Sequence, residues 1–394
     1  MKLSATTLSV LSPSHPLWLV GFRPFFTLVF LSGVFLPWYW VAVFSGWLHW
    51  DWGPFPPNRW HGHEMFYGFG WALLGGFLLT ASKNWVKIRG LHGAGLILAV
   101  LLWFADRALM LLEPGYSLWG RAVGSLFLLY VIGYLLYSLI RFRSNDSFAD
   151  NPLFWVALPM FLVAKQLMLT EDYFDQGLAM TIGLFRVAFV IMFERTMTQF
   201  MKNALNCPLP RRPWLDYGIK ISMLLAVGSI FLPAMPAAIL LLSTASLLLF
   251  RFLIWKPQVG MRNFGIGVMY LGYFGLVVHL GLEIVHRLEP SWGVGSYSLH
   301  MFTFFCMGLI IPAMMIRISQ GHTGRKPVFR FWDKAALGLM LAGGLFRVLL
   351  TQIWPQAYLT WVVLAGVGWT SCFAILGIGY TPYLFQNRID GKEH

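Results

Sequence analysis

The stretch "RWHGHEMFYG", residues 59–68, brings two histidines and a glutamate to the start of a long apolar segment. Imidazole is the commonest protein ligand of transition metals and a frequent axial ligand of haem iron. Side chains two positions apart on a helix point about 200° away from each other, so His61 and His63 cannot both bind one metal. Either two sites flank this helix, or one histidine is a ligand and the other is structural. Met65 shares a helix face with His61.

A second group of candidate ligands lies far along the chain. His279, Glu283 and His286 follow one another at helical spacing and share one stripe, and His300 belongs to the next apolar segment. Several imidazoles from different helices favour a metal or haem site between those helices. In such a site Glu283 either binds copper or a proton, or orients an imidazole. The alternative is a set of interfacial histidines that hydrogen-bond to each other and to water.

Four basic side chains lie inside apolar segments, namely Arg107, Lys165, Arg186 and Arg347. A buried arginine costs about 2.5–3.5 kcal/mol even on the gentler insertion scales, so each cation needs a counter-charge. The carboxylates of Asp106, Glu283 and Glu64 are too few for four cations and a cationic metal. Two haem propionates would supply the missing negative charge, and arginine binds carboxylates bidentately. Alternatively, these side chains extend to lipid headgroups or line a polar cavity.

A third group of polar residues lies at the opposite ends of the predicted helices. Its members are Arg23, Arg195, Asn203, Arg317, His322 and Arg325. With arginines on both sides of it in the sequence, His322 is suited to bind an anion or a quinone headgroup. The alternative is that this histidine caps a helix end and binds lipid phosphate.

The composition shows which elements must position these residues. Of the 394 residues, 58% are apolar and 11% are charged, against about 25% charged in an ordinary soluble domain. So much apolar surface predicts a polytopic helical protein in the lipid bilayer. The net charge of +13 lies in short loops, which is typical of topology signals and not of nucleic-acid binding. Three separated cysteines indicate neither a disulfide framework nor a cysteine-based zinc site.

A membrane-spanning helix needs about 20 mostly apolar residues, and we find twelve such segments. We therefore expect an all-α bundle of twelve transmembrane helices that forms a single domain over residues 1–394. The predicted spans are 18–48, 61–82, 91–112, 118–140, 152–169, 177–200, 214–232, 236–254, 263–287, 297–318, 333–352 and 357–385.

The basic residues of the loops predict how this bundle is oriented. They are concentrated in alternate loops, and the remaining loops carry few. Because cytoplasmic loops are the basic ones, both termini are expected in the cytoplasm. In this orientation one outer layer of the membrane contains five of the ten histidines, namely His61, His63, His279, His286 and His300.

Four stretches of the chain resemble the NnrS family of membrane proteins. They are "GFRPFF" (21–26), "WHGHEMFYGFGWALLGGFLLTASKNW" (60–85), "RTMTQFMKNAL" (195–205) and "LHMFTFFCMGLIIPAMMIRISQGHTGR" (299–325). The pattern WHxHEM is specific in combination with GHTGR, and each is weak alone. The chain departs from the family at "MFE" (192–194), at Thr198 and at "FFC" (304–306), which affects helix packing and leaves the histidines in place.

The resemblance implies b-type haem, copper and a role in nitric oxide tolerance in the bacterial inner membrane. The order of His61, Met65, "GGF" (75–77) and "NW" (84–85) is also similar to the second helix of haem-copper oxidases, whose first histidine is an axial haem ligand. The double-histidine copper motif of those oxidases is missing, so oxygen reduction of the usual kind is not expected.

We therefore expect haem b between the second and tenth helices, with His61 and His300 as the axial pair and His63 as the rival to His61. The stripe of His279, Glu283 and His286 is the candidate copper or second-metal site. The four buried cations are candidate clamps for the haem propionates. Nitric oxide would bind to this haem or receive electrons from it, with quinol as the electron donor.

Two other classes of function stay open. A transporter or channel would use the same polar residues to line a path, and it would contain no haem. A sensor or buffer would bind nitric oxide at the haem without converting it, so the protein is an enzyme only if turnover occurs.

Overall fold

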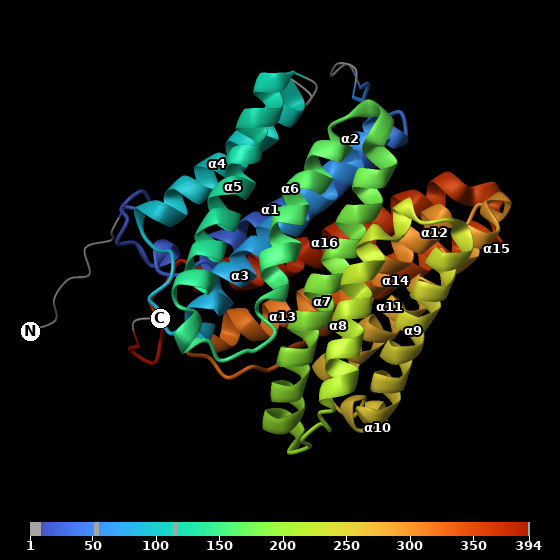
Figure 1. Ribbon diagram of the computed structural model, residues 1–394. Helices are drawn as coiled ribbons and strands as arrows, with labels where there is room; N and C mark the ends of the chain where they lie inside the picture. The colour runs from blue at the N-terminus through green and yellow to red at the C-terminus, as the bar shows by residue number, and fades with distance from the viewer. Residues whose placement is uncertain (1–8, 51–54, 113–116, 393–394) are drawn as a thin grey trace, which may run out of the picture.

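The computed structural model describes residues 9–50, 55–112 and 117–392, and within them every regular element is a helix (Figure 1). This confirms the all-α membrane bundle expected from the composition. Apolar side chains fill the space between the helices and also cover much of the outside, as expected where helices face lipid.

The helices follow one another with short connections. The first part of the chain forms α1 (Phe22–Phe44), α2 (Pro57–His63), η2 (Glu64–Gly70), α3 (Trp71–Trp85), α4 (Ala94–Leu112), α5 (Leu118–Arg141), α6 (Leu153–Met168) and α7 (Phe174–Leu205). The second part forms α8 (Pro213–Val227), η5 (Gly228–Phe231), α9 (Ala234–Ile254), α10 (Pro257–Gly260), α11 (Phe264–Leu288), α12 (Gly295–His300), η7 (Met301–Met307), α13 (Gly308–Gly321), α14 (Phe331–Gly344), η8 (Leu345–Leu350), α15 (Thr351–Ile353) and α16 (Tyr358–Leu384).

Each predicted span coincides with an observed helical segment to within a few residues. In the described chain, eleven of these segments are long and apolar enough to cross a membrane. The remaining helix, α6, is apolar but has only 16 residues and is therefore about 24 Å long, against about 30 Å of hydrocarbon. The predicted count of twelve spans thus depends on whether α6 crosses the membrane.

The described ends of the chain lie on the same side of the bundle. The ring of His15, before α1, packs against the ring of Phe385, after α16, with 5.9 Å between centroids. The guanidinium of Arg23 donates from Nη1 to the carbonyl oxygens of Leu384 and Gln386. Ends that meet on one side agree with an even number of crossings, and a total of twelve that includes α6 stays a prediction. The side of the membrane on which the ends lie stays a prediction.

Close approach between helices depends on glycine at the contact of α14 with α16. A Cβ atom on Gly368 would lie 2.6 Å from the carbonyl oxygen of Leu339, and one on Gly343 would lie 3.0 Å from that of Ala365. Only residues without side chains allow the two backbones this distance. Helix α16 also packs along α1, so these contacts hold the C-terminal helices against the N-terminal ones.

Three spans contain π-helical segments that the sequence analysis did not foresee. They are η2, η7 and η8, with bounds Glu64–Gly70, Met301–Met307 and Leu345–Leu350. The first directly follows His63, the second directly follows His300, and the third contains Arg347. π-helical turns are rare and occur frequently at functional sites, because they redirect the side chains beside them.

The position of α6 gives the first testable prediction. If α6 crosses the membrane, a cysteine at Ser144 and a cysteine at Asp172 lie on opposite sides of it, because both positions are exposed in the connections that flank this helix. In a background with Cys207→Ser, a membrane-impermeant thiol reagent added to intact cells should label D172C and leave S144C unlabelled. Equal labelling of both variants would mean that α6 does not cross.

Candidate functional site

The structure brings together His61 from α2, His300 from α12 and Arg347 from η8. The two histidines lie within electrostatic range of each other, and Arg347 lies within range of both. The imidazole of His61 stacks on the indole of Trp40, with 4.7 Å between centroids and 10° between planes. The predicted axial pair and one of the four predicted clamps therefore share one place between the helices.

The polar contacts at this place leave several nitrogen atoms without partners. His300 Nδ1 is 2.7 Å from the carbonyl oxygen of Ser296, so it donates its proton there and leaves the lone pair on Nε2. Arg347 donates from Nη2 to Ser296 Oγ at 3.2 Å. His61 Nδ1 and Arg347 Nη1 are buried and bond to no residue that the structure describes. No ion pair joins Arg347 to a carboxylate within the described chain.

His63 faces the other side of its helix, as its spacing from His61 predicts. Its Nδ1 lies 2.9 Å from Glu64 Oε1, and its ring stacks on that of Tyr67 at 5.1 Å. The other carboxylate oxygen of Glu64 lies 2.8 Å from Arg107 Nε. His63 Nε2 is buried without a partner in the described residues, so this imidazole keeps the lone pair that a ligand needs.

A buried cluster of charges continues from this side of the bundle. Asp106 lies 2.7 Å from Arg107 Nη2 and accepts two bonds from Lys165 Nζ, at 2.8 and 2.7 Å. Lys165 Nζ also donates to the carbonyl oxygen of Gly124 at 2.7 Å. Two carboxylates therefore neutralise two cations here. The charge shortage inferred from the sequence does not apply to Arg107 and Lys165, because Asp106 bridges them and Glu64 supplies the second negative charge.

The three candidate metal ligands on α11, namely His279, Glu283 and His286, have different neighbours. Glu283 forms an ion pair with Arg186 and a second with Arg287 at 3.4 Å, so its carboxylate already has two cationic partners. His279 Nδ1 lies 2.7 Å from the carbonyl oxygen of Ser298, and its Nε2 lies 3.7 Å from Glu283 Oε2. Arg186 is thus neutralised by the protein, as Arg107 and Lys165 are.

His286 lies two turns from His279 on the same stripe, beside Gly295. A Cβ atom on Gly295 would lie 3.0 Å from the imidazole of His286. The structure brings no group of three histidine, cysteine, aspartate or glutamate side chains into a metal-binding arrangement within the described chain. Met65 lies in η2, partly buried among apolar side chains.

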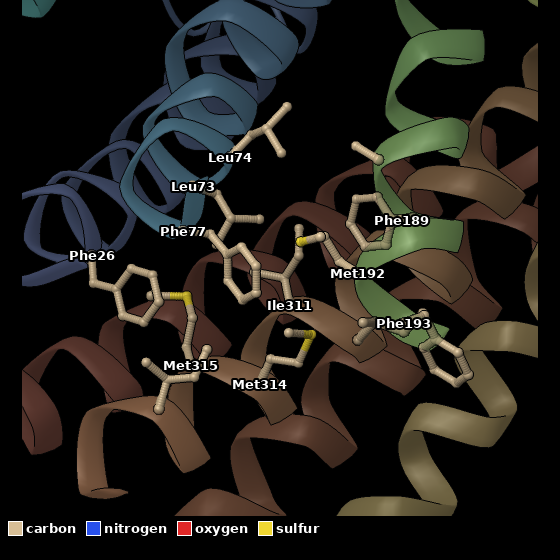
Figure 2. A pocket seen from close by; sticks show the side chains of 13 residues that line it. Phe26, Leu73, Leu74, Phe77, Phe189, Met192, Phe193, Ile311, Met314 and Met315 are labelled. Atoms are coloured by element: carbon tan, nitrogen blue, oxygen red, sulfur yellow. The ribbon is translucent and has the colours of Figure 1, made fainter. Parts of the chain in front are cut away.

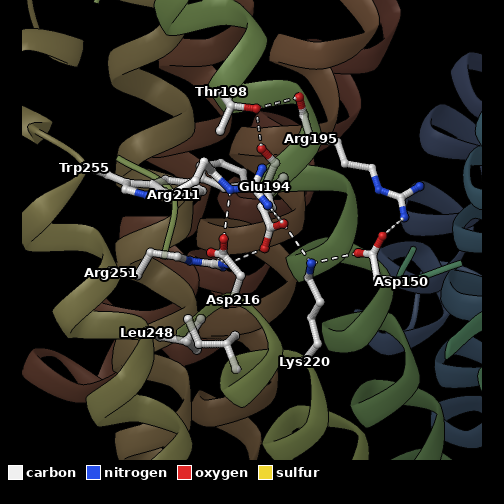
Figure 3. A network of polar contacts seen from close by, with 12 residues as sticks. Asp150, Glu194, Arg195, Thr198, Arg211, Asp216, Lys220, Leu248, Arg251 and Trp255 are labelled. Carbon is white, nitrogen blue, oxygen red and sulfur yellow. Dashed lines mark hydrogen bonds and ion pairs between the residues drawn. The ribbon is translucent and has the colours of Figure 1, made fainter. Parts of the chain in front are cut away.

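At the other ends of the helices, Glu194 anchors a network of buried charges that the sequence analysis missed (Figure 3). Its Oε1 accepts from Lys220 at 2.7 Å and from Arg211, and its Oε2 accepts from Arg251 at 2.9 Å. Lys220 also donates to Asp150 at 2.7 Å. The carboxylate of Glu194 thus connects its own helix α7 with α8, with α9 and with the segment between α7 and α8.

Two further contacts complete this network. Asp150 accepts from Arg195 at 2.7 Å, and the guanidinium of Arg195 lies 4.0 Å from the ring centroid of Phe148. Asp216 accepts from Arg211 Nε at 2.8 Å. The sequence did contain one signal for this network. Lys220 and Arg251 lie inside predicted apolar spans, where a buried cation needs a negatively charged partner. Asn203, predicted with this group, is exposed near the end of α7.

Between the two polar ends lies an apolar cavity of about 40 Å³ (Figure 2). Its lining includes Phe26, Phe77, Phe189, Ile311 and Met314, which come from α1, α3, α7 and α13. All of the lining side chains are apolar. A volume of this size exceeds what a single water needs and accommodates a small apolar molecule such as a diatomic gas, but not haem.

The comparison with protein families gives one match, to the family model described as NnrS protein, over residues 16–388. This chain belongs to the NnrS family. The match includes every polar centre described above. A comparison with curated proteins found no significant match.

The stretch "GHTGR", which carries part of the resemblance to the NnrS family, lies where the ends of the chain meet. His322 packs its ring on Phe22 with 5.4 Å between centroids. Arg325 lies 3.8 Å from the ring centroid of Tyr383, and Arg317 lies 3.9 Å from that of Phe200. His322 thus lies beside α1, which begins with the other NnrS-like stretch, "GFRPFF".

The network around Glu194 predicts a large loss of stability for a minimal substitution. Glu194→Gln removes the negative charge shared by Lys220 and Arg251, and breaking a buried ion pair in this way costs about 3–5 kcal/mol. The apparent melting temperature of the detergent-solubilised protein should fall accordingly. Asp175→Asn makes the same chemical change at an exposed position and should leave it nearly unchanged. Equal melting temperatures for the two variants would contradict a structural role for the network.

Proposed function

We propose that this NnrS-family protein binds haem b between α2 and α12 and acts on nitric oxide in the bacterial inner membrane. The observation that carries the proposal is the convergence of His61, His300 and Arg347, each on a span whose helix widens into a π-helical segment close by. Helix widening next to paired imidazoles is typical of a cofactor site.

The residues at this place fit an iron porphyrin. His300 is anchored through Nδ1 to a backbone carbonyl, the arrangement that fixes the tautomer of a metal-binding histidine and directs Nε2 to the metal. Buried polar groups are costly when unpartnered, and His61 Nδ1 and Arg347 Nη1 have no partners in the described chain. An axial bond would use the imidazole, and a propionate would neutralise the guanidinium.

The roles of the chain's own residues follow from these contacts. Trp40 holds the ring plane of His61 by stacking, and Ser296 holds both His300 and Arg347. Phe304, one turn beyond His300, packs with Trp369 at 5.2 Å between ring centroids, and these two rings would limit the access of water from that side. When bound, haem would supply an iron centre that binds nitric oxide and exchanges electrons with it, and quinol would be the electron donor.

For the expected copper we propose His279 as the principal ligand. Its Nδ1 is held by the carbonyl oxygen of Ser298, and its Nε2 is buried and unpartnered among the described residues. Because Glu283 is already paired with Arg186 and Arg287, we propose that its negative charge orients the imidazole of His279 instead of binding the copper. His286, on the same stripe, would be a ligand only if copper lies between the two imidazoles.

The axial pair is tested by an absorbance spectrum of the purified protein with haem and metal content measured per chain. His61→Ala and His300→Ala should each change or abolish the haem spectrum, and both should abolish nitric oxide consumption with a supplied quinol. His92→Ala, at an exposed position, is the matched control.

If His63→Ala rather than His61→Ala changes the spectrum, the axial ligand lies on the opposite face of that helix. A protein purified from haem-supplemented cells without any haem would favour a transporter. Haem that binds nitric oxide without consuming it would favour a sensor or buffer.

Arg347 gives a second test of the same site. Loss of its positive charge should disfavour the reduced haem, so Arg347→Leu should lower the midpoint potential by tens of millivolts and weaken haem retention. Arg347→Lys keeps the charge and should stay close to the unsubstituted protein. Redox titration of both variants measures the difference. The same potential in both would show that this guanidinium lies too far from the haem to act as a clamp.

A further inference from the structure

Arg23, in the first turn of α1, is a fully buried arginine that no carboxylate pairs within the described chain. Its exposed fraction is 0%, and its Nη1 is used by the carbonyl oxygens of Leu384 and Gln386. Its Nε and Nη2 bond to no described residue. Two donors of a charged group are therefore held in the protein interior without an acceptor, which is costly unless something else supplies one.

The neighbours of Arg23 add positive charge instead of removing it. Arg325 and Arg388 lie within electrostatic range of its guanidinium. Arg23, Arg388 and Lys83, which is buried at the end of α3, in turn surround the imidazole of His322. These four cations come from α1, α3, the connection after α13 and the segment after α16.

One of the three arginines, Arg388, pairs with a carboxylate of the described chain. Asp390 binds Arg388 through both oxygens, at 2.9 and 2.6 Å, while Arg388 Nη1 donates to the carbonyl oxygen of His322. Arg325 Nη1 is buried without a partner in the described chain. Three guanidinium groups and one carboxylate leave a surplus of two positive charges among these arginines of the described chain.

We propose that Arg23, Arg325 and His322 form a binding site for an anion of the phosphate class. A tetrahedral oxyanion offers several acceptor oxygens at once, which matches two guanidinium groups with unpartnered donors. The site lies at the ends of α1, α3 and α13, the depth at which lipid headgroups meet protein, so the phosphate belongs either to an anionic lipid or to a free phosphate. This inference concerns the opposite end of the bundle from the haem site and does not depend on haem.

The experiment uses the full chain, purified in detergent and stripped of lipid, and measures the apparent melting temperature against ligand concentration. Inorganic phosphate is compared with chloride at equal ionic strength, and phosphatidylglycerol is compared with phosphatidylcholine in mixed micelles. We expect a saturable rise with phosphate, with phosphatidylglycerol or with both, because a ligand that binds only the folded state stabilises it. The probe that produces the rise identifies the source of the phosphate.

Substitutions locate the effect. Arg23→Gln should weaken binding at least about tenfold, and Arg325→Gln should do the same if the first variant fails to fold. Lys202→Gln removes one positive charge from an exposed position on α7 and should bind as the unsubstituted chain does. A rise of the same size in all variants, or no rise with either probe, would overturn the proposal.

The pH dependence of stability supplies a second readout. Burial, with the charges of Lys83, Arg388 and Arg23, lowers the pKa of His322 from 6.5 to about 4 when no anion is bound. The unfolded chain then takes up a proton that the folded chain refuses, so His322 makes stability fall as the pH decreases from 6.5 to 4. The negative charge of a bound phosphate would raise this pKa and reduce that loss. The reduction should be absent in His322→Gln, and a reduction of equal size in that variant would exclude the imidazole from the site.

Discussion

A cation inside the bundle must be given a negative charge, because hydrocarbon cannot solvate it. The structure meets this requirement almost completely with its own carboxylates. Asp106 and Glu64 neutralise Arg107 and Lys165, and Glu283 neutralises Arg186. The network around Glu194 does the same at the other end of the bundle. Two buried arginines of the described chain remain without a carboxylate, Arg23 and Arg347, and each lies beside a histidine at one end of the bundle. Both of these places therefore call for an external anion.

The backbone is adapted at only one of these two places. At the Arg347 end, the π-helical segments η2, η7 and η8 widen three spans next to His63, His300 and Arg347. A widened turn disrupts the regular ladder of backbone hydrogen bonds and persists where surrounding packing maintains it. At the Arg23 end the spans remain regular, and the positive charge is assembled from helix ends and the C-terminal segment. A large planar cofactor requires helices to move apart, whereas a small tetrahedral anion requires only a few donors, such as the unpartnered nitrogens of Arg23 and Arg325.

The sequence predicted the spans well, because the length and apolar character of a membrane helix are local properties. It also predicted that His61 and His63 face opposite sides, because this follows from helical spacing alone. The partners of the buried charges could not be predicted in this way. The count of three carboxylates for four cations agrees with the structure, but it could not show which cation lacks a partner. Asp106 and Glu64 neutralise Arg107 and Lys165, and Glu283 neutralises Arg186. Arg347 is the one of the four left without a carboxylate in the described chain. Lys220 and Arg251 were visible within apolar spans, yet their shared partner Glu194 lies on a third helix and only the tertiary structure brings them together.

The apolar layer between the two polar ends of the bundle helps to distinguish a transporter of polar solutes from a protein that acts on a gas. Along α7, seven apolar residues separate Arg186 from Glu194, a distance of about 12 Å. The cavity at this level is lined only by apolar side chains, among them Phe189 and Met314 (Figure 2). An ion or polar solute crossing the bundle would need polar partners through this layer, and the cavity offers it none. A small uncharged molecule such as nitric oxide needs no such partners and can dissolve in the layer, so the packing that opposes a polar transport path would leave a gaseous substrate free to reach the haem proposed above.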